Sequence, residues 1–394
     1  MAYACTLPLS PAHASFSVST SPARRVIPYL NACSAIGRPL KYTVAKSPYF
    51  FGCSHGEDLN LPRRGLLKGI GAAGISMCAS VISEPSVQGM EKLPFKPEGY
   101  NFWTWRNHKI HYVVQGEGRP IVLIHGFGAS AFHWRYNIPK LAKEFKVYAI
   151  DLLGFGWSEK AIIDYNANVW RDQVADFLNE IVKDPAILVG NSLGGLTALI
   201  TAADCPEFVS GVAILNSAGQ FRNPEEQSKN AVEETAIQRI IINPLKNLVQ
   251  RAVLTFAFWQ AKQPSRVQSV LKSVYPNSTN VDDYLIESII RPTGDPNAGE
   301  VYYRLITQFM FSPSKVTLND ILEKLSCPLL LLWGDLDPWV GPSKAEKIKE
   351  IYPNSSLIHL QAGHCPHDEV PDLVNEALLN WALPLSSPIS SQAI

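Results

Sequence analysis

No aspartate or glutamate precedes Glu57, although the 394-residue chain contains 35 acidic residues and 35 lysines and arginines. The overall balance of charge gives no indication of a nucleic-acid partner. The acid-free start is rich in Ser, Ala and Pro and carries Arg24, Arg25, Arg38, Lys41 and Lys46. This composition is typical of a chloroplast transit peptide. We therefore expect residues 1–90 to be a disordered plastid-targeting leader.

The leader contains no apolar run long enough to cross a membrane, which takes about 20 residues. Arg63 and Arg64 precede the mildly apolar stretch 69–82, which is interrupted by glycines. This arrangement resembles a twin-arginine signal, and in a plastid it predicts transport to the thylakoid lumen. The alternative is a weak membrane-associated helix or a linker in the stroma. Chloroplast stroma and lumen both remain open, as does loose association with the thylakoid membrane.

Cysteines are few beyond the leader, where only Cys205, Cys327 and Cys365 occur, at wide spacing. This number and spacing exclude a disulfide framework or a Cys-x-x-Cys metal site and predict free thiols. A Gly-x-Gly-x-x-Gly fingerprint, a phosphate-binding loop and a zinc-like histidine spacing are all missing too. We expect no cofactor and no metal, and the sequence leaves the oligomeric state open.

Short apolar segments alternate with helical patterns from Tyr100 onwards. Most of these segments are continuously apolar, as in strands buried on both faces of a parallel sheet. They cover residues 102–105, 110–115, 120–124, 146–151, 186–190, 212–216, 328–333 and 357–360. The pattern predicts an α/β fold with a mostly parallel, doubly wound sheet.

Residues 220–323 interrupt the alternation with helical patterns, for example over 237–258 and 267–274. Because a compact domain does not hold so long a structureless loop, we expect a helical cap inserted between two late strands. The expected domains are a core of residues 91–219 and 324–384, a cap of residues 220–323, and a disordered tail of residues 385–394.

Ser192 lies in the short pattern Gly190-Asn-Ser192-Leu-Gly194, directly between a predicted strand and a predicted helix. A nucleophile elbow requires this context, because its serine adopts a strained turn that small neighbours accommodate. A serine hydroxyl also needs a base, and the base needs a carboxylate to orient it. The order expected in such a fold is serine, then acid, then histidine.

An acid and a histidine follow the last two predicted strands in that order. Asp337 lies three residues after Gly334 and is preferred to Asp335, which would help to form the turn. His364 directly follows Gly363, after the last strand, and it is preferred to His367 as the catalytic base. We therefore predict Ser192, Asp337 and His364 as a catalytic triad.

A glycine-rich loop, His125-Gly-Phe127-Gly, follows the strand 120–124. Glycines there let the backbone approach a substrate, so that the amides of Phe127 and Leu193 form an oxyanion hole. His125 is expected to be structural and to pack this loop.

Together these four motifs resemble the α/β-hydrolase superfamily. The segments 125–137 and 148–158 are similar to those of plastid hydrolases of the chlorophyll dephytylase and pheophytinase type. Those enzymes cleave the phytyl ester of a chlorin ring with a Ser/His/Asp triad. The resemblance implies a hydrolase fold and reaction class, with the phytyl ester as one expected substrate.

The expected function is that of a plastid serine hydrolase that cleaves a carboxylic ester of a small lipophilic molecule. A serine at the elbow forms an acyl-enzyme, unlike the aspartate of related dehalogenases and epoxide hydrolases. Three alternatives remain: hydrolysis of a C–C bond beside a ketone, acyl transfer, and a ligand-sensing receptor with vestigial hydrolysis.

Overall fold

The structure is a computed structural model, and it describes residues 89–222, 243–311 and 316–386. The chain divides into two units, Met1–Cys78 and Ala79–Ile394, and every described residue belongs to the second. Residues 1–88 of the predicted leader, with Arg63 and Arg64, and most of the predicted tail lie outside the described residues.

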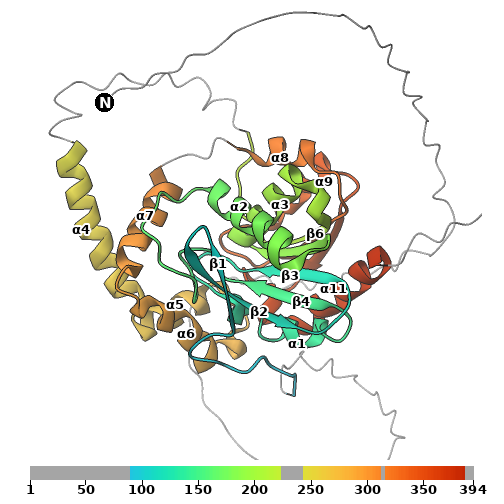
Figure 1. The fold of residues 1–394 in the computed structure, drawn as a ribbon, viewed down its shortest axis with the longest axis horizontal. Helices are drawn as coiled ribbons and strands as arrows, with labels where there is room; N and C mark the ends of the chain where they lie inside the picture. The colour runs from blue at the N-terminus through green and yellow to red at the C-terminus, as the bar shows by residue number, and fades with distance from the viewer. Residues whose placement is uncertain (1–88, 223–242, 312–315, 387–394) are drawn as a thin grey trace, which may run out of the picture. The chain divides into compact units, whose positions relative to one another are not determined.

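Eight strands form one sheet in the order β1-β2-β4-β3-β5-β6-β7-β8 (Figure 1). The pairs β1–β2 and β2–β4 are antiparallel and the other pairs are parallel. The strands are β1 (Asn101–Trp105), β2 (His108–Gln115), β3 (Pro120–Ile124), β4 (Lys146–Ile150), β5 (Ala186–Asn191), β6 (Val209–Leu215), β7 (Leu329–Gly334) and β8 (Ser356–Leu360). This confirms the predicted sheet, with boundaries that differ by at most a few residues.

The central strands are continuously apolar because helices cover both faces of the sheet. In β3, Val122 and Ile124 belong to one core cluster, whereas Ile121 and Leu123 belong to the other. The first cluster includes α2 (Ala167–Phe177), α3 (Leu193–Asp204), α8 (Leu318–Lys324) and α9 (Pro342–Ile351). The second includes α1 (Asn137–Leu141) and α11 (Pro371–Ser386).

In the described part of the chain, five α-helices lie between β6 and β7. The last of them, α8, packs into the core, and the other four confirm the predicted helical insertion. These four are α4 (Asn243–Ala261), α5 (Pro264–Val274), α6 (Asp283–Ile290) and α7 (Ala298–Phe311). The pattern placed the start of the second helix at residue 267, but α5 begins at Pro264, since proline suits the first helical position. Figure 1 shows α4 and α7 at one side of the molecule and α11 at the other.

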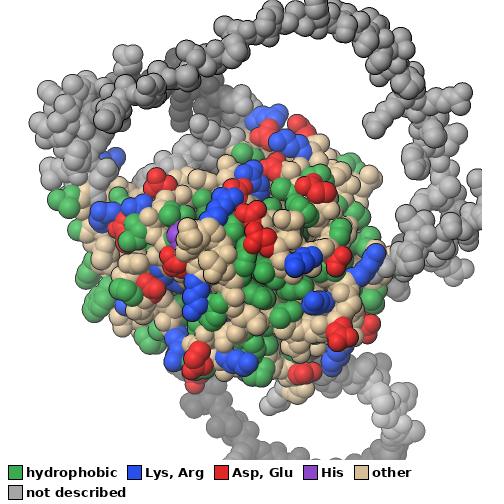
Figure 2. Space-filling model, in the orientation of Figure 1, with side chains coloured by type: hydrophobic (Ala, Val, Ile, Leu, Met, Phe, Trp, Pro, Cys, Tyr) green, Lys and Arg blue, Asp and Glu red, His purple; other side chains and the backbone are tan. Residues whose placement is uncertain are grey.

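Charged side chains of both signs intermingle with apolar ones on the face shown in Figure 2. Over the described ranges, no helix combines the length and the hydropathy that a membrane crossing needs.

Candidate functional site

Ser192 stands on a strained turn between β5 and α3. Its φ of 53° and ψ of −114° lie in a region that side-chain-bearing residues rarely adopt. The turn is tight because a Cβ at Gly190 would collide with the carbonyl of Gly194. A Cβ at Gly194 would in turn collide with the carbonyl of Ile124 in β3. The two glycines therefore allow strand and helix to approach closely enough to form an elbow.

His364 and Asp337 meet beyond the ends of β8 and β7. The Nδ1 atom of His364 lies 2.6 Å from Oδ2 of Asp337. The Asp337 carboxylate also accepts hydrogen bonds from Nδ2 of Asn216 at 2.9 Å and from the amide of Trp339 at 2.7 Å. Burial alone would raise the pKa of Asp337, but the hydrogen bond and charge of His364 and the backbone amides lower it below its usual value. The carboxylate is therefore held ionised beside the imidazole.

The two alternative residues lie in other surroundings. Asp335 pairs with Nδ1 of His359 at 2.6 Å, on a more exposed part of the surface. His367 is fully buried, and its ring lies 4.1 Å from that of Trp134 between centroids. Neither ring nitrogen of His367 has a hydrogen-bond partner among the described residues. Asp337 and His364, rather than Asp335 and His367, thus form the acid–base pair in the site.

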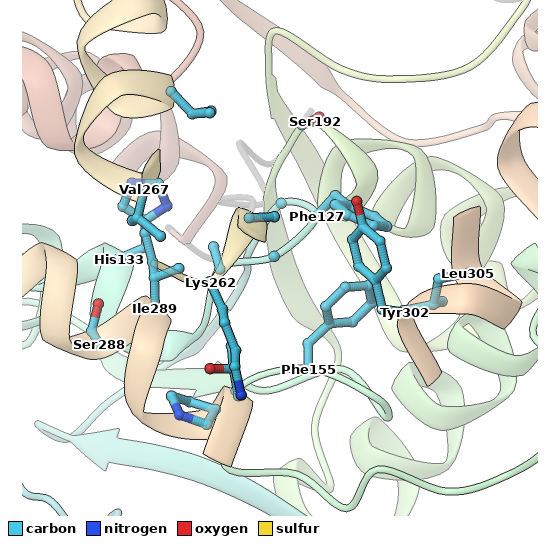
Figure 3. A pocket seen from close by; sticks show the side chains of 18 of the residues that line it. Phe127, His133, Phe155, Ser192, Lys262, Val267, Ser288, Ile289, Tyr302 and Leu305 are labelled. Atoms are coloured by element: carbon cyan, nitrogen blue, oxygen red, sulfur yellow. The ribbon is translucent and has the colours of Figure 1, made fainter. Parts of the chain in front are cut away.

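The loop after β3 carries Phe127, whose side chain lies beside the pocket near Ser192 (Figure 3). Leu193 is the first residue of α3, so its amide has no acceptor within the helix. His125 fixes this loop, since its Nδ1 donates to the carbonyl of Gly126 at 2.7 Å and its Nε2 accepts from the amide of Leu152 at 3.0 Å. Burial lowers the pKa of His125, which agrees with a neutral, structural imidazole.

Ser192 and His364 line the same pocket, which has a volume of about 550 Å³. Core and cap both contribute to its walls, and most of the lining is apolar. Figure 3 shows Phe127 and Phe155 from the core and Val267, Ile289, Tyr302 and Leu305 from the cap around this space. No three His, Cys, Asp or Glu side chains in the described parts of the chain are grouped to hold a metal ion. Pockets of this size and lining suit small lipophilic ligands.

Sequence reasoning missed two asparagines that hold the site together. Asn216 donates to Asp337 and accepts from the amide of Gly334 at 2.8 Å, with its own backbone at a φ of 41°. Asn191 donates through Nδ2 to the carbonyl of His364 at 2.9 Å and to that of Leu215 at 3.1 Å. The only available signal is their position, because Asn191 is the last residue of a buried strand and Asn216 directly follows another, at the edge where the site forms.

The cap also contacts the histidine loop directly. The amide of His364 donates to the carbonyl of Val274, the last residue of α5, at 3.0 Å. Glu369 accepts from the amide of Gly363 through one oxygen and from the amide of Asn277 through the other, both at 2.7 Å. The end of α5 therefore fixes the backbone that carries His364.

The site combines a serine on a tight turn after a strand, an acid–histidine pair after two later strands and an inserted helical cap. This combination defines a class of hydrolases. The family model described as the alpha/beta hydrolase fold matches residues 119–371. The chain belongs to this family.

Several known proteins are similar to this chain. It is 29% identical over 325 residues to the chloroplastic pheophytinase of Arabidopsis thaliana, covering 71% of this chain and 65% of that protein. It is 38% identical over 278 residues to the 2-hydroxy-6-oxo-6-(2'-aminophenyl)hexa-2,4-dienoic acid hydrolase of Metapseudomonas resinovorans, covering 69% of this chain and 87% of the relative. The crystal structure of a serine hydrolase involved in carbazole degradation aligns with a TM-score of 0.58 at 23% identity, over 72% of this chain and 98% of the other, and supports the fold.

Proposed function

We propose that the protein is a serine hydrolase that cleaves carboxylic esters of lipophilic molecules through an acyl-enzyme. The observation that carries the proposal is the His364–Asp337 pair at 2.6 Å on the pocket that Ser192 also lines. Nucleophile, base and orienting acid are the groups that acyl transfer to a serine requires.

In the proposed reaction, Oγ of Ser192 attacks the ester carbonyl carbon while His364 accepts the hydroxyl proton. Asp337 holds the imidazole and stabilises the imidazolium that forms. The amides of Phe127 and Leu193 donate to the carbonyl oxygen as it becomes negative. The C–O bond then breaks, His364 returns the proton to the departing alcohol, and water repeats the sequence to release the acid.

The mostly apolar pocket supports a lipophilic substrate. The similarity to a pheophytinase supports a phytyl ester of a chlorophyll-type pigment as one such substrate. This chain aligns with 65% of the length of that relative. We therefore propose the pigment ester as a substrate of this chain on the similarity and the pocket together.

The test uses a fluorophosphonate probe, which labels activated serines, on the wild type and on Ser192→Ala. We expect labelling and ester hydrolysis in the wild type, and a loss of at least about 10³-fold in turnover in the variant. Assays with pheophytin and with short-chain esters then locate the preferred substrate. A wild-type protein that is folded yet neither labelled nor active would refute the proposal.

Hydrolysis of a C–C bond beside a ketone is a second candidate, because the same triad can perform it. The 38% identity with the hexadienoic acid hydrolase supports it. Turnover of a vinylogous oxo-acid that exceeds turnover of every ester tested would favour this candidate.

We also propose that the protein works in the chloroplast. The acid-free, basic leader supports this location, as does the similarity to a chloroplastic relative. The full chain should be imported and shortened by isolated chloroplasts. A shift from lumen to stroma in Arg63→Lys/Arg64→Lys would support the twin-arginine interpretation, and a chain that stays outside the organelle would contradict the location.

A further inference from the structure

Helix α4 is apolar, yet none of its described side chains is fully buried. Five large apolar side chains are more than half exposed: Leu248 (65%), Val249 (56%), Val253 (59%), Phe256 (62%) and Trp259 (53%). At about 100° per residue, these positions fall within roughly 140° of the helix circumference. They therefore form one continuous apolar face, and an exposed face of this kind marks an interaction site.

The charged residues within α4 and α5 have a single sign. Residues 243–281, which form α4, α5 and the turns that follow, contain no aspartate or glutamate but five basic residues. Arg251 is paired with Glu300 of α7 at 2.6 Å. The other four, Lys246, Lys262, Arg266 and Lys272, form no ion pair with a described residue. The two helices that carry the apolar face thus contribute basic residues and no acidic ones.

Other residues of the same two helices line the pocket of Ser192. Phe258 of α4 and Lys262, just after it, line the pocket, and so does Val270 of α5, which is 52% exposed. On the core side, Trp339 is 60% exposed and also lines the pocket, with its ring 4.9 Å from that of His364. The helices α4 and α5 therefore also form part of the pocket wall.

We propose that α4 and α5 form a docking face for the surface of an anionic lipid bilayer. The docking face consists of the five exposed side chains of α4 together with Lys262, Arg266 and Lys272. Helices with Leu, Phe and Trp on one side and Lys or Arg beside them lie in the plane of the membrane interface. A symmetric contact with a second copy would instead bring these cations against one another. The docking face thus suits lipid headgroups and acyl chains together.

Docking itself does not depend on the chemistry at Ser192. One consequence does rest on the proposed function: docking brings a lipophilic ester in the bilayer close to a pocket that residues of α4 and α5 line.

The experiment compares full-length variants by co-sedimentation with vesicles of phosphatidylcholine alone or mixed with phosphatidylglycerol. Phe256→Asp/Trp259→Asp alters the docking face at positions outside the pocket. Leu373→Asp/Leu383→Asp is the matched control, with two exposed leucines of α11 (42% and 40%) replaced in the same way. We expect the wild type and the control to bind mixed vesicles, and the docking-face variant to bind at least about tenfold more weakly. Arg266→Glu/Lys272→Glu should lose binding to the mixed vesicles at low salt.

Turnover of a water-soluble short-chain ester shows whether each variant is folded. The proposal fails if the wild type does not bind the mixed vesicles or if the docking-face variant binds as the wild type does. It also fails if sedimentation shows a wild-type dimer that becomes a monomer in this variant while vesicle binding is unchanged. Vesicle binding by a wild type that hydrolyses no ester would leave docking standing and refute the proposed function alone.

Discussion

At the scale of single residues, two carboxylates two positions apart have different surroundings. Asp337 is removed from solvent and accepts from His364, Asn216 and the amide of Trp339. Asp335 is partly exposed and pairs with His359. Only the first can orient a base beside the pocket. A buried carboxylate with several donors holds its charge, and an imidazolium gains most from a charge of that kind.

Replacing each carboxylate by its amide separates these assignments. Asp337→Asn is expected to lower kcat by about 10³- to 10⁴-fold, because the amide favours the wrong tautomer of His364 and cannot stabilise the imidazolium. Asp335→Asn, the matched control, should retain kcat within a few-fold. Steady-state hydrolysis of a short-chain ester measures both. Equal losses in the two variants would remove Asp337 from its proposed role.

At the scale of elements, the β5–α3 junction depends on glycines where backbones approach each other. Gly194 is the second residue of α3 and packs against the carbonyl of Ile124 in β3. Gly299 holds the same position in α7, where an added Cβ would meet two ring carbons of Phe258 at the ordinary contact distances of 3.5 and 3.9 Å. Identical substitutions at these sites therefore have opposite expected effects.

Gly194→Ala should lower the free energy of unfolding by about 1–3 kcal/mol, since strand and helix must move apart. It should also lower labelling of Ser192 by the fluorophosphonate probe. Gly299→Ala should raise the free energy of unfolding by up to about 1 kcal/mol, because alanine is the better helix former. Urea denaturation at neutral pH measures both. A Gly194→Ala variant with wild-type stability and labelling would contradict the role given to the elbow.

At the scale of the whole molecule, buried polar residues join the cap to the core. Arg135 donates through Nε to Asp368 at 2.7 Å and through a second nitrogen to the carbonyl of Asn280 at 2.6 Å, and it also contacts Asp282 at the start of α6. Tyr275, just after α5, links Asp368 to His133. The loop that carries His364 and the cap are thus bound to one another by charge as well as by packing.

Buried histidines make this assembly sensitive to acid. Burial lowers the pKa of His125 and His367 and lowers that of His133 to about 3. The unfolded chain therefore takes up protons below about pH 6.5 that the folded chain does not, and stability falls as the pH falls. The raised pKa values of buried Asp368 and Glu369 act in the opposite direction. A comparison of variants can separate the contribution of His367 to this pH dependence from the other contributions.

Between pH 7 and pH 5, His367→Leu should reduce the wild-type loss of unfolding free energy by about 2 kcal/mol. His359 is the contrasting control, because the hydrogen bond and charge of Asp335 and the contact with Glu346 raise its pKa. His359→Gln should leave a loss at least as large as that of the wild type. Urea denaturation at the two pH values measures these differences, and an unchanged loss in His367→Leu would contradict the prediction.

The sequence by itself determined the sheet, the helical insertion and the chemical groups available to the site. Strand periodicity, the glycines around Ser192 and the order of serine, acid and histidine are local properties of the chain, so they can be predicted without coordinates. The sequence already favoured Asp337 over Asp335, and the tertiary structure pairs Asp337 with His364. Only the tertiary structure decided that Asn216 and Asn191 support the pair, and that α4 has an apolar face exposed among the described residues. These features depend on how residues far apart in the chain pack together, and a local pattern carries no information about that packing.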